Sequence, residues 1–233
     1  MNQVVTKLVL SLNIFIVLFL SGCGALPQNI PLNEVDKIAI QTADILVTRQ
    51  LTPGFMFTTP NKALVDAGVA EWADPSKPFT WTLITETHQV PDFTNAVKEA
   101  FLSEIADTPN FQRFQISESV EPWDDSADFS RLAAKYEAEY VLEFKTRIGM
   151  FGYNPLSWQT YRMNYFGDMI LVRLEDQMPI WKVSCDVRAG DDNPLILPGE
   201  DFLKGDGELF RAAAAYATST CAKQLASEFN ANQ

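Results

Sequence analysis

Three cysteines and one histidine are the residues of this 233-residue chain best suited to covalent or acid–base chemistry. Cys23 lies close to the N-terminus, whereas Cys185 and Cys221 lie in the last quarter of the chain. A thiol can form a disulfide, carry a covalent group or act as a nucleophile, and its surroundings decide among these. Glu86 is the only carboxylate close to His88 before Pro91, and a lone histidine in such a proline-bounded segment is typical of a surface residue and not of a catalytic one.

The first 25 residues have the pattern of an export signal. Lys7 follows a short polar start, and residues 8–20 are apolar except for Ser11 and Asn13. This run is too short for a transmembrane helix, which needs about 20 apolar residues, but it suits the apolar region of a signal peptide. It ends in LSGC at positions 20–23. Small residues before a cysteine at this place resemble the lipobox of bacterial lipoproteins.

This resemblance implies cleavage between Gly22 and Cys23, so that residues 1–22 are a signal peptide. It also implies a diacylglycerol thioether on the Cys23 sulfur and an acyl chain such as palmitate on the new amino group. Two lipid signals give stable anchoring to a membrane. Gly24 follows in place of the aspartate of an inner-membrane retention signal, which favours the outer membrane, facing the periplasm. An uncleaved anchor, or a secretory signal with a chance cysteine, are the alternatives.

Composition and charge exclude several classes of protein. The chain has 18 basic and 30 acidic residues and a formal net charge of −12, which argues against nucleic-acid binding, because that affinity comes mainly from Lys and Arg. One histidine leaves no room for a histidine-rich metal site, so we expect no metal and no cofactor beyond the lipid on Cys23. The length suits one domain with a sizeable core. We expect residues 23–35 to be a tether and residues 36–233 a single periplasmic domain.

Cys185 and Cys221 are predicted to form a disulfide, because a pair of cysteines in an exported domain meets an oxidising compartment. Residues 180–188 alternate apolar and polar side chains, as in a half-buried strand with Cys185 facing inward. Residues 207–229 repeat small and apolar side chains every four positions, as in a helix with Cys221 on its inner stripe. Closing the loop between the two cysteines would stabilise the folded state by roughly 3–4 kcal/mol. Two buried free thiols or a nucleophilic cysteine are the alternatives.

The order of the remaining elements indicates an α+β fold. We expect a two-layer domain with a largely antiparallel sheet and helices packed on one face of it. The C-terminal helix is expected to be joined to a strand by the disulfide. Residues 51–91 are the least regular, because five prolines interrupt them. Helices are expected over 92–105, 131–136 and 207–229, and strands over 36–49, 111–116, 139–148, 158–174 (with a bulge at Gly167) and 180–188.

One segment stands out as a candidate binding surface. Residues 149–165 crowd aromatic side chains around glycine and proline at the tip of an expected hairpin. Phe151, Tyr153 and Trp158 are the candidates for contact with a partner protein, glycan strands or a membrane interface. The alternative is that the hairpin folds back and these rings fill the core.

A second resemblance covers residues 132–225. LAAKY at 132–136 precedes EYVLE at 139–143, and the strand of Cys185 and the helix of Cys221 follow. This set resembles uncharacterised proteobacterial envelope lipoproteins and, more distantly, penicillin-binding-protein activators and the curli secretion lipoprotein. The resemblance implies a two-layer α/β domain in the cell envelope.

The function that this sequence favours is that of a non-enzymatic outer-membrane lipoprotein that binds or scaffolds an envelope protein or peptidoglycan. The chain contains no nucleophile elbow, no phosphate-binding glycine loop and no metal-binding His or Cys pair. One alternative is a hydrolase of cell-wall glycan, which needs two carboxylates converging in one cleft. The other is a carrier of lipid or another small molecule, which needs an apolar cavity.

The lipid anchor predicts the behaviour of a Cys23→Ala variant. Without the thiol no thioether can form, so the protein should move from the membrane fraction to the soluble periplasmic fraction and lose palmitate labelling. Fractionation and labelling of both forms would measure this. A variant that still partitions fully into membranes would contradict the lipobox interpretation.

Overall fold

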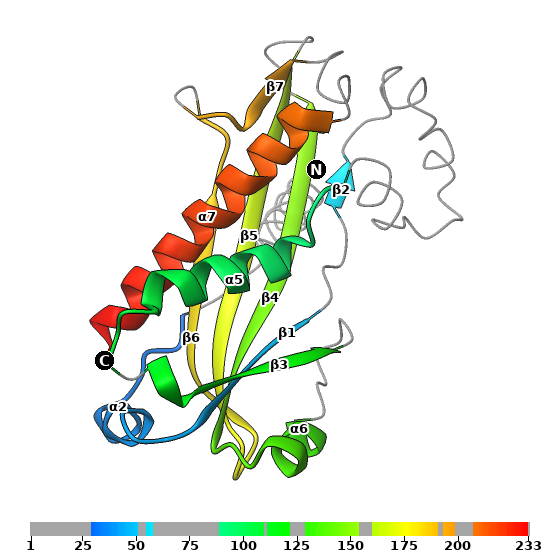
Figure 1. Cartoon of the computed structure of the whole chain (residues 1–233). Coiled ribbons are helices and arrows are strands. Elements are labelled where there is room, and N and C mark those ends of the chain that lie inside the picture. The colour runs from blue at the N-terminus through cyan, green and yellow to red at the C-terminus, as the bar shows by residue number, and fades with distance from the viewer. Residues whose placement is uncertain are drawn as a thin grey trace, which may run out of the picture.

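The computed structural model describes residues 29–50, 55–57, 89–109, 111–121, 129–153, 160–190, 193–198 and 207–232. Within these ranges the chain forms one sheet with helices packed against it (Figure 1). None of the helices in these ranges is long and apolar enough to cross a bilayer.

The sheet contains seven strands in the order β3-β1-β4-β5-β6, with β2 beside β4 and β7 beside β5. The long strands β4, β5 and β6 form an antiparallel meander, whereas β1 runs parallel to both β3 and β4. The predicted α+β fold is therefore confirmed. The strands are β1 (Ile45–Gln50), β2 (Phe55–Phe57), β3 (Phe114–Glu121), β4 (Tyr140–Tyr153), β5 (Thr160–Arg173), β6 (Met178–Val187) and β7 (Ile196–Pro198).

Two long helices, α5 (Phe93–Ile105) and α7 (Glu208–Ala231), cross one face of the sheet side by side (Figure 1). The Asp92 side chain caps α5 by accepting a hydrogen bond from the Asn95 amide at 3.0 Å. In α7 the buried stripe is rich in alanine, which lets this helix lie close to β5 and β6. Both helices match the predicted ranges closely.

Aromatic rings fill the space between these helices and the sheet. Phe101 of α5 lies 5.1 Å from Phe144 of β4 and 5.6 Å from Phe229 of α7, measured between ring centroids. Phe229 also contacts Trp181 of β6 at 5.8 Å. Tilted and edge-on pairs of this kind contribute about 0.5–1.5 kcal/mol each beyond their buried area.

A second, smaller core lies on the opposite face of the sheet. There α6 (Phe129–Tyr136) places Leu132 against Leu46 of β1 and Val141 of β4. These strand positions alternate with those that face α5 and α7, as expected for a pleated strand. The helices are therefore not all on one face of the sheet, because the short helix α6 covers one end of the opposite face.

The expected strand over 36–49 is wrong in its first half. Residues Glu34–Ile40 form the helix α2, and β1 begins only at Ile45. The Asn33 side chain caps α2 by accepting a hydrogen bond from the Asp36 amide at 2.9 Å. An ion pair between Glu34 and Lys37 adds an i,i+3 contact. The Ile and Val content had favoured a strand, but the cap and these charges favour a helix.

Two further boundaries differ from the expectation. The segment predicted as a strand from residue 111 starts with a 3-10 turn, η3 (Phe111–Arg113), before β3. The bulge expected at Gly167 of β5 lies across from it on β4, between Thr146 and Ile148. The extra residue, Arg147, reverses the facing of the rest of β4. Ile148 therefore lies on the opposite face of β4 from Leu142, whereas strict alternation along the expected strand over 139–148 would place both on one face.

The disulfide between Cys185 and Cys221 is confirmed. It joins β6 to α7, with 5.2 Å between the two Cα atoms, and both residues are fully buried. Gly167 of β5 lies directly under it. A Cβ atom on Gly167 would lie 3.1 Å from the Cys185 sulfur and 3.3 Å from the Cys221 sulfur. The Tyr165 ring would lie 3.2 Å from the same Cβ, so the disulfide and this ring together occupy the space that a side chain at this position would take.

This contact predicts the effect of Gly167→Ala. The added methyl group should lower the free energy of unfolding by about 1–3 kcal/mol through overpacking. In a background where Cys185 and Cys221 are both alanine, the loss should shrink, because the sulfur atoms are gone. Gly190→Ala is a matched control, since its Cβ would meet only Asn193, at 3.4 Å. Denaturant unfolding would measure all variants, and an equal loss in both backgrounds would contradict the packing argument.

Candidate functional site

The candidate site is the face of β4, β5 and β6 that points away from α5 and α7, here called the polar face. Strand alternation places polar side chains there while their neighbours enter the aromatic core. Basic residues outnumber acidic ones on this face, although the chain as a whole carries −12. The polar face comprises Glu143, Lys145, Arg147, Arg162, Asn164, Phe166, Asp168, Lys182, Ser184, Asp186 and, just after β6, Arg188.

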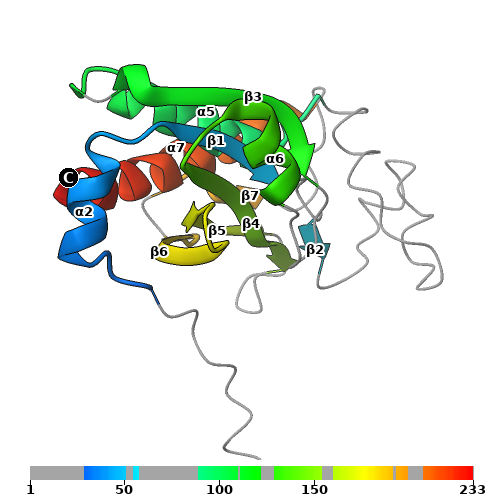
Figure 2. The same cartoon turned by 90° about the horizontal axis from the view of Figure 1, so that it is seen from below.

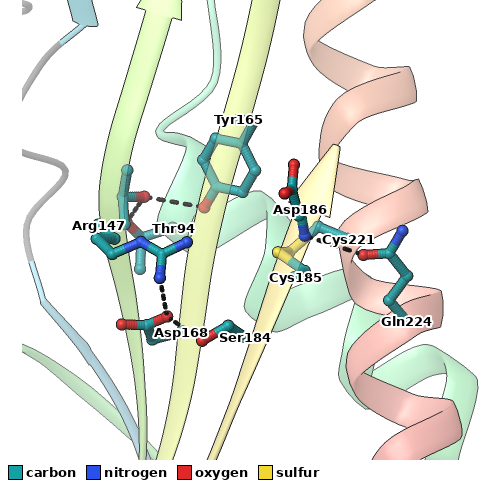
Figure 3. The surroundings of a disulfide bond; sticks show 10 residues. Thr94, Arg147, Tyr165, Asp168, Ser184, Cys185, Asp186, Cys221 and Gln224 are labelled. Carbon is teal, nitrogen blue, oxygen red and sulfur yellow. Dashed lines mark hydrogen bonds and ion pairs between the residues drawn. A yellow bond between two sulfur atoms is a disulfide. The ribbon is translucent and has the colours of Figure 1, made fainter. Parts of the chain in front are cut away.

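Asp168 is the centre of the polar face, and its side chain is only 3% exposed. Its Oδ1 accepts a hydrogen bond from the Ser184 hydroxyl at 2.7 Å and lies 3.6 Å from the Arg147 guanidinium. Its Oδ2 pairs with the Lys182 ammonium at 3.0 Å. Figure 3 shows Arg147 and Ser184 converging on this carboxylate. Three strands are thus joined through one buried charge, which is stable only because it is paired.

Phe166 lies between two cations of the polar face. The guanidinium carbons of Arg147 and Arg188 each lie 5.6 Å from the centre of its ring. Arg188 also pairs with Asp186 at 2.5 Å. Contacts of this type are attractive because the ring face carries negative charge. These contacts join β4, β5 and the residue just after β6.

A buried chain of hydroxyl groups lies on the helix side of the same strands. The Thr146 hydroxyl lies 2.7 Å from that of Thr94, at the start of α5, and 2.9 Å from that of Tyr165 (Figure 3). Burial raises the pKa of Tyr165 well above its ordinary value, with the Thr146 hydrogen bond acting in the opposite direction. The phenol therefore stays neutral and remains a hydrogen-bond donor. This chain satisfies polar groups that the fold buries.

A glycan hydrolase needs a pair of carboxylates, and the polar face carries two that are buried. Glu143 and Asp168 both lie there and are 4% and 3% exposed. Glu143 accepts a hydrogen bond from the Gln50 amide at 3.0 Å, and Asp168 is held as described above. Both carboxylates thus already hold neighbouring side chains, so this arrangement does not favour the hydrolase. Among the described residues, no group of three or more His, Cys, Asp or Glu could hold a metal ion.

The three aromatic candidates for the partner surface have different outcomes. Phe151 is only 1% exposed, stacks on Tyr161 at 5.0 Å and contacts Phe210 of α7 at 5.6 Å, so its assignment to a partner surface is wrong. The bulge in β4 turns Phe151 toward the helices. Tyr153 ends β4, paired with Tyr161 in the ladder. Trp158 lies outside the described residues.

The start of the domain is a feature that the sequence analysis missed. The Ile30 amide donates to the Lys182 carbonyl and the Lys182 amide to the Ile30 carbonyl, both at 3.0 Å. Leu32 is 7% exposed and belongs to the main core. The expected tether thus joins the domain from Ile30 onward, whereas Gly22, Cys23 and His88 lie outside the described residues. The apolar residues Ile30 and Leu32, two positions apart between Asn29 and Asn33, were the one available signal.

The same junction protects the free edge of β6. Ile30 pairs with the edge at Lys182, and the Gln224 side chain of α7 accepts the hydrogen bond of the Asp186 amide at 3.1 Å (Figure 3). An uncovered edge would offer unpaired backbone groups to other chains. The edge that the tether meets is therefore closed at these two positions by the protein's own residues.

No family model matches the chain, and no curated protein matches it. Among solved structures it is similar to a PelC dodecamer from Paraburkholderia phytofirmans, with 9% identity, a TM-score of 0.35, and 82% of this chain and 95% of that chain covered. It is also similar to lipoprotein GNA1162 from Neisseria meningitidis (14% identity, TM-score 0.26, 65% and 84% covered). A third is the C-terminal domain of LpoB from Escherichia coli (13% identity, TM-score 0.20, 66% and 95% covered). Values of this size show neither a shared family nor a shared activity.

The Asp168 cluster predicts a large effect of Asp168→Asn. The change keeps the shape but leaves Arg147 and Lys182 without their shared carboxylate, so the free energy of unfolding should fall by about 2–4 kcal/mol. Asp186→Asn is the matched control, because Asp186 and Arg188 are largely exposed, and it should cost at most about 1 kcal/mol. Denaturant unfolding would measure both variants. Equal losses would contradict the structural role given to Asp168.

Proposed function

We propose that this protein is a non-enzymatic lipoprotein of the outer membrane that faces the periplasm and binds or scaffolds an envelope partner, either a protein or peptidoglycan. The observation that carries the proposal is the junction at Ile30, because it joins the expected lipid anchor to a folded domain. The extended chain from Cys23 to Ile30 reaches at most about 25 Å. A lipid on Cys23 would therefore keep the domain close to the membrane surface.

The interior of the domain supports binding more than catalysis. The disulfide joins β6 to α7, and Asp168 joins three strands, so the middle of the sheet is cross-linked on both faces. The carboxylates Glu143 and Asp168 are engaged with neighbouring side chains. A rigid body that presents fixed surfaces is what a scaffold or adaptor requires.

The tip of the β4–β5 hairpin is the proposed contact with the partner. Phe151 packs on Tyr161 and Phe210, so the adjoining end of β4 is tied to α7. Tyr153 and Trp158 come next along the chain and remain the candidates for contact. Aromatic side chains on a rigid base are effective anchors, because little conformational entropy is lost when they bind.

Crosslinking and pull-down of the lipidated protein from envelopes would test this proposal. Tyr153→Ala and Trp158→Ala should reduce recovery of the partner while shifting the melting temperature by no more than about 2–4 °C. Phe151→Ala is the comparison, because emptying a buried ring site should cost about 3–5 kcal/mol and lower the melting temperature much more. Unchanged recovery of the partner with Tyr153→Ala and Trp158→Ala would contradict the proposed surface.

A further inference from the structure

We propose that the protein contacts the membrane surface through an apolar end formed by Val35 and Ile38 of α2 and Met178 of β6. The occupant of this surface is a zwitterionic phospholipid bilayer. The inference rests on the proposed lipid anchor and goes beyond it, because it states which part of the domain lies against the lipid.

These three residues are the most exposed large apolar side chains that the structure describes. Val35 is 77% exposed, Ile38 is 68% exposed and Met178 is 54% exposed. Val35 and Ile38 are three positions apart, so they lie on one side of α2, while Asp36 and Ile40 are buried on the other. Single exposed apolar residues are common, but three at one end of a domain call for an explanation.

One arginine joins the two elements that carry these residues. From the end of β5, the Arg173 guanidinium pairs with Asp36 of α2 at 3.1 Å and with Asp176 of the β5–β6 turn at 2.7 Å. Met178 follows that turn directly, and its amide donates to the Asp176 carboxylate at 3.3 Å. Figures 1 and 2 show α2 and the β5–β6 turn at the same end of the sheet. The apolar end is therefore a fixed part of the domain.

The length of the tether decides which end can meet the bilayer. Ile30 pairs with Lys182, which stands opposite Ile170 of β5. Met178 is four residues from Lys182 along β6, or about 13 Å, whereas the far end of β5 at Thr160 is ten residues from Ile170, or about 33 Å. The chain from Cys23 to Ile30 reaches about 25 Å. It can bring the apolar end to the lipid but not the far end.

The charge around the apolar end decides which kind of lipid surface it can contact. At this end the acidic residues Glu34, Asp36, Glu175 and Asp176 outnumber the basic residues Lys37 and Arg173. Glu34 and Asp176 are 85% and 42% exposed on their side chains, and the whole chain carries −12. Anionic headgroups would repel such an end, whereas a zwitterionic surface would not. Three apolar side chains make a weak contact by themselves. They suffice to orient a domain that its anchor already holds at high local concentration.

Site-specific photocrosslinking tests this orientation. The full lipidated chain carries benzoylphenylalanine at Ile38, at Met178 or, as the control, at Leu209, and is placed in phosphatidylcholine vesicles. Leu209 is also apolar and 43% exposed, but it belongs to the first turn of α7, and α7 begins at the other end of the sheet (Figure 1). Mass spectrometry should find at least about fivefold more lipid adduct at Ile38 and Met178 than at Leu209, and adding phosphatidylglycerol should lower the yield.

A second variant tests the apolar contact itself. Val35→Ser with Ile38→Ser should reduce lipid adducts at a photoprobe on Met178, whereas Leu209→Ser should leave them unchanged. Flotation of the vesicles separates the two proposals. Protein that floats but shows equal adducts at Ile38 and Leu209 overturns the orientation and leaves the anchor standing. Protein that does not float overturns the anchor and the orientation with it.

Discussion

The contact of the Cys185–Cys221 disulfide with Gly167 is the constraint on which the rest of the structure depends. Gly167 leaves room on β5 for both sulfur atoms, and the disulfide ties the last helix to the strand beside it. With α7 held there, α5 packs alongside it and the aromatic core closes between them. A larger residue at this one position would press against both sulfur atoms and weaken the packing of α7 on the sheet.

The two faces of β5 are stabilised by different kinds of interaction. Gly167 faces the disulfide, and the next residue, Asp168, faces the other way into the polar face. One side of the strand is therefore held by packing and the other by ion pairs. Lys182 belongs to both the Asp168 cluster and the junction with Ile30, so the entry of the chain is tied to the centre of the sheet. This gives a rigid body close to its expected anchor.

Geometry also relates the proposed contacts to one another. The apolar end lies by α2 and the β5–β6 turn, whereas Tyr153 ends β4 at the opposite end of the same meander. With the first end against the membrane, the end of β4 at Tyr153 would lie away from the lipid by about the length of the long strands. Such an arrangement would suit the proposed anchored scaffold, since its proposed partner surface would be turned away from the membrane.

The sequence by itself determined the α+β class, the long helices α5 and α7, the meander and the disulfide, because these follow from local periodicity and from cysteine spacing on inward faces. Tertiary structure decided the rest. The bulge at Arg147 turned Phe151 into the core, and the ion pair between Arg173 and Asp36 holds α2 at the end of β5. The pairing of Ile30 with Lys182 joins residues far apart in the chain. Such long-range contacts leave no periodic signal, so only the folded chain could reveal them.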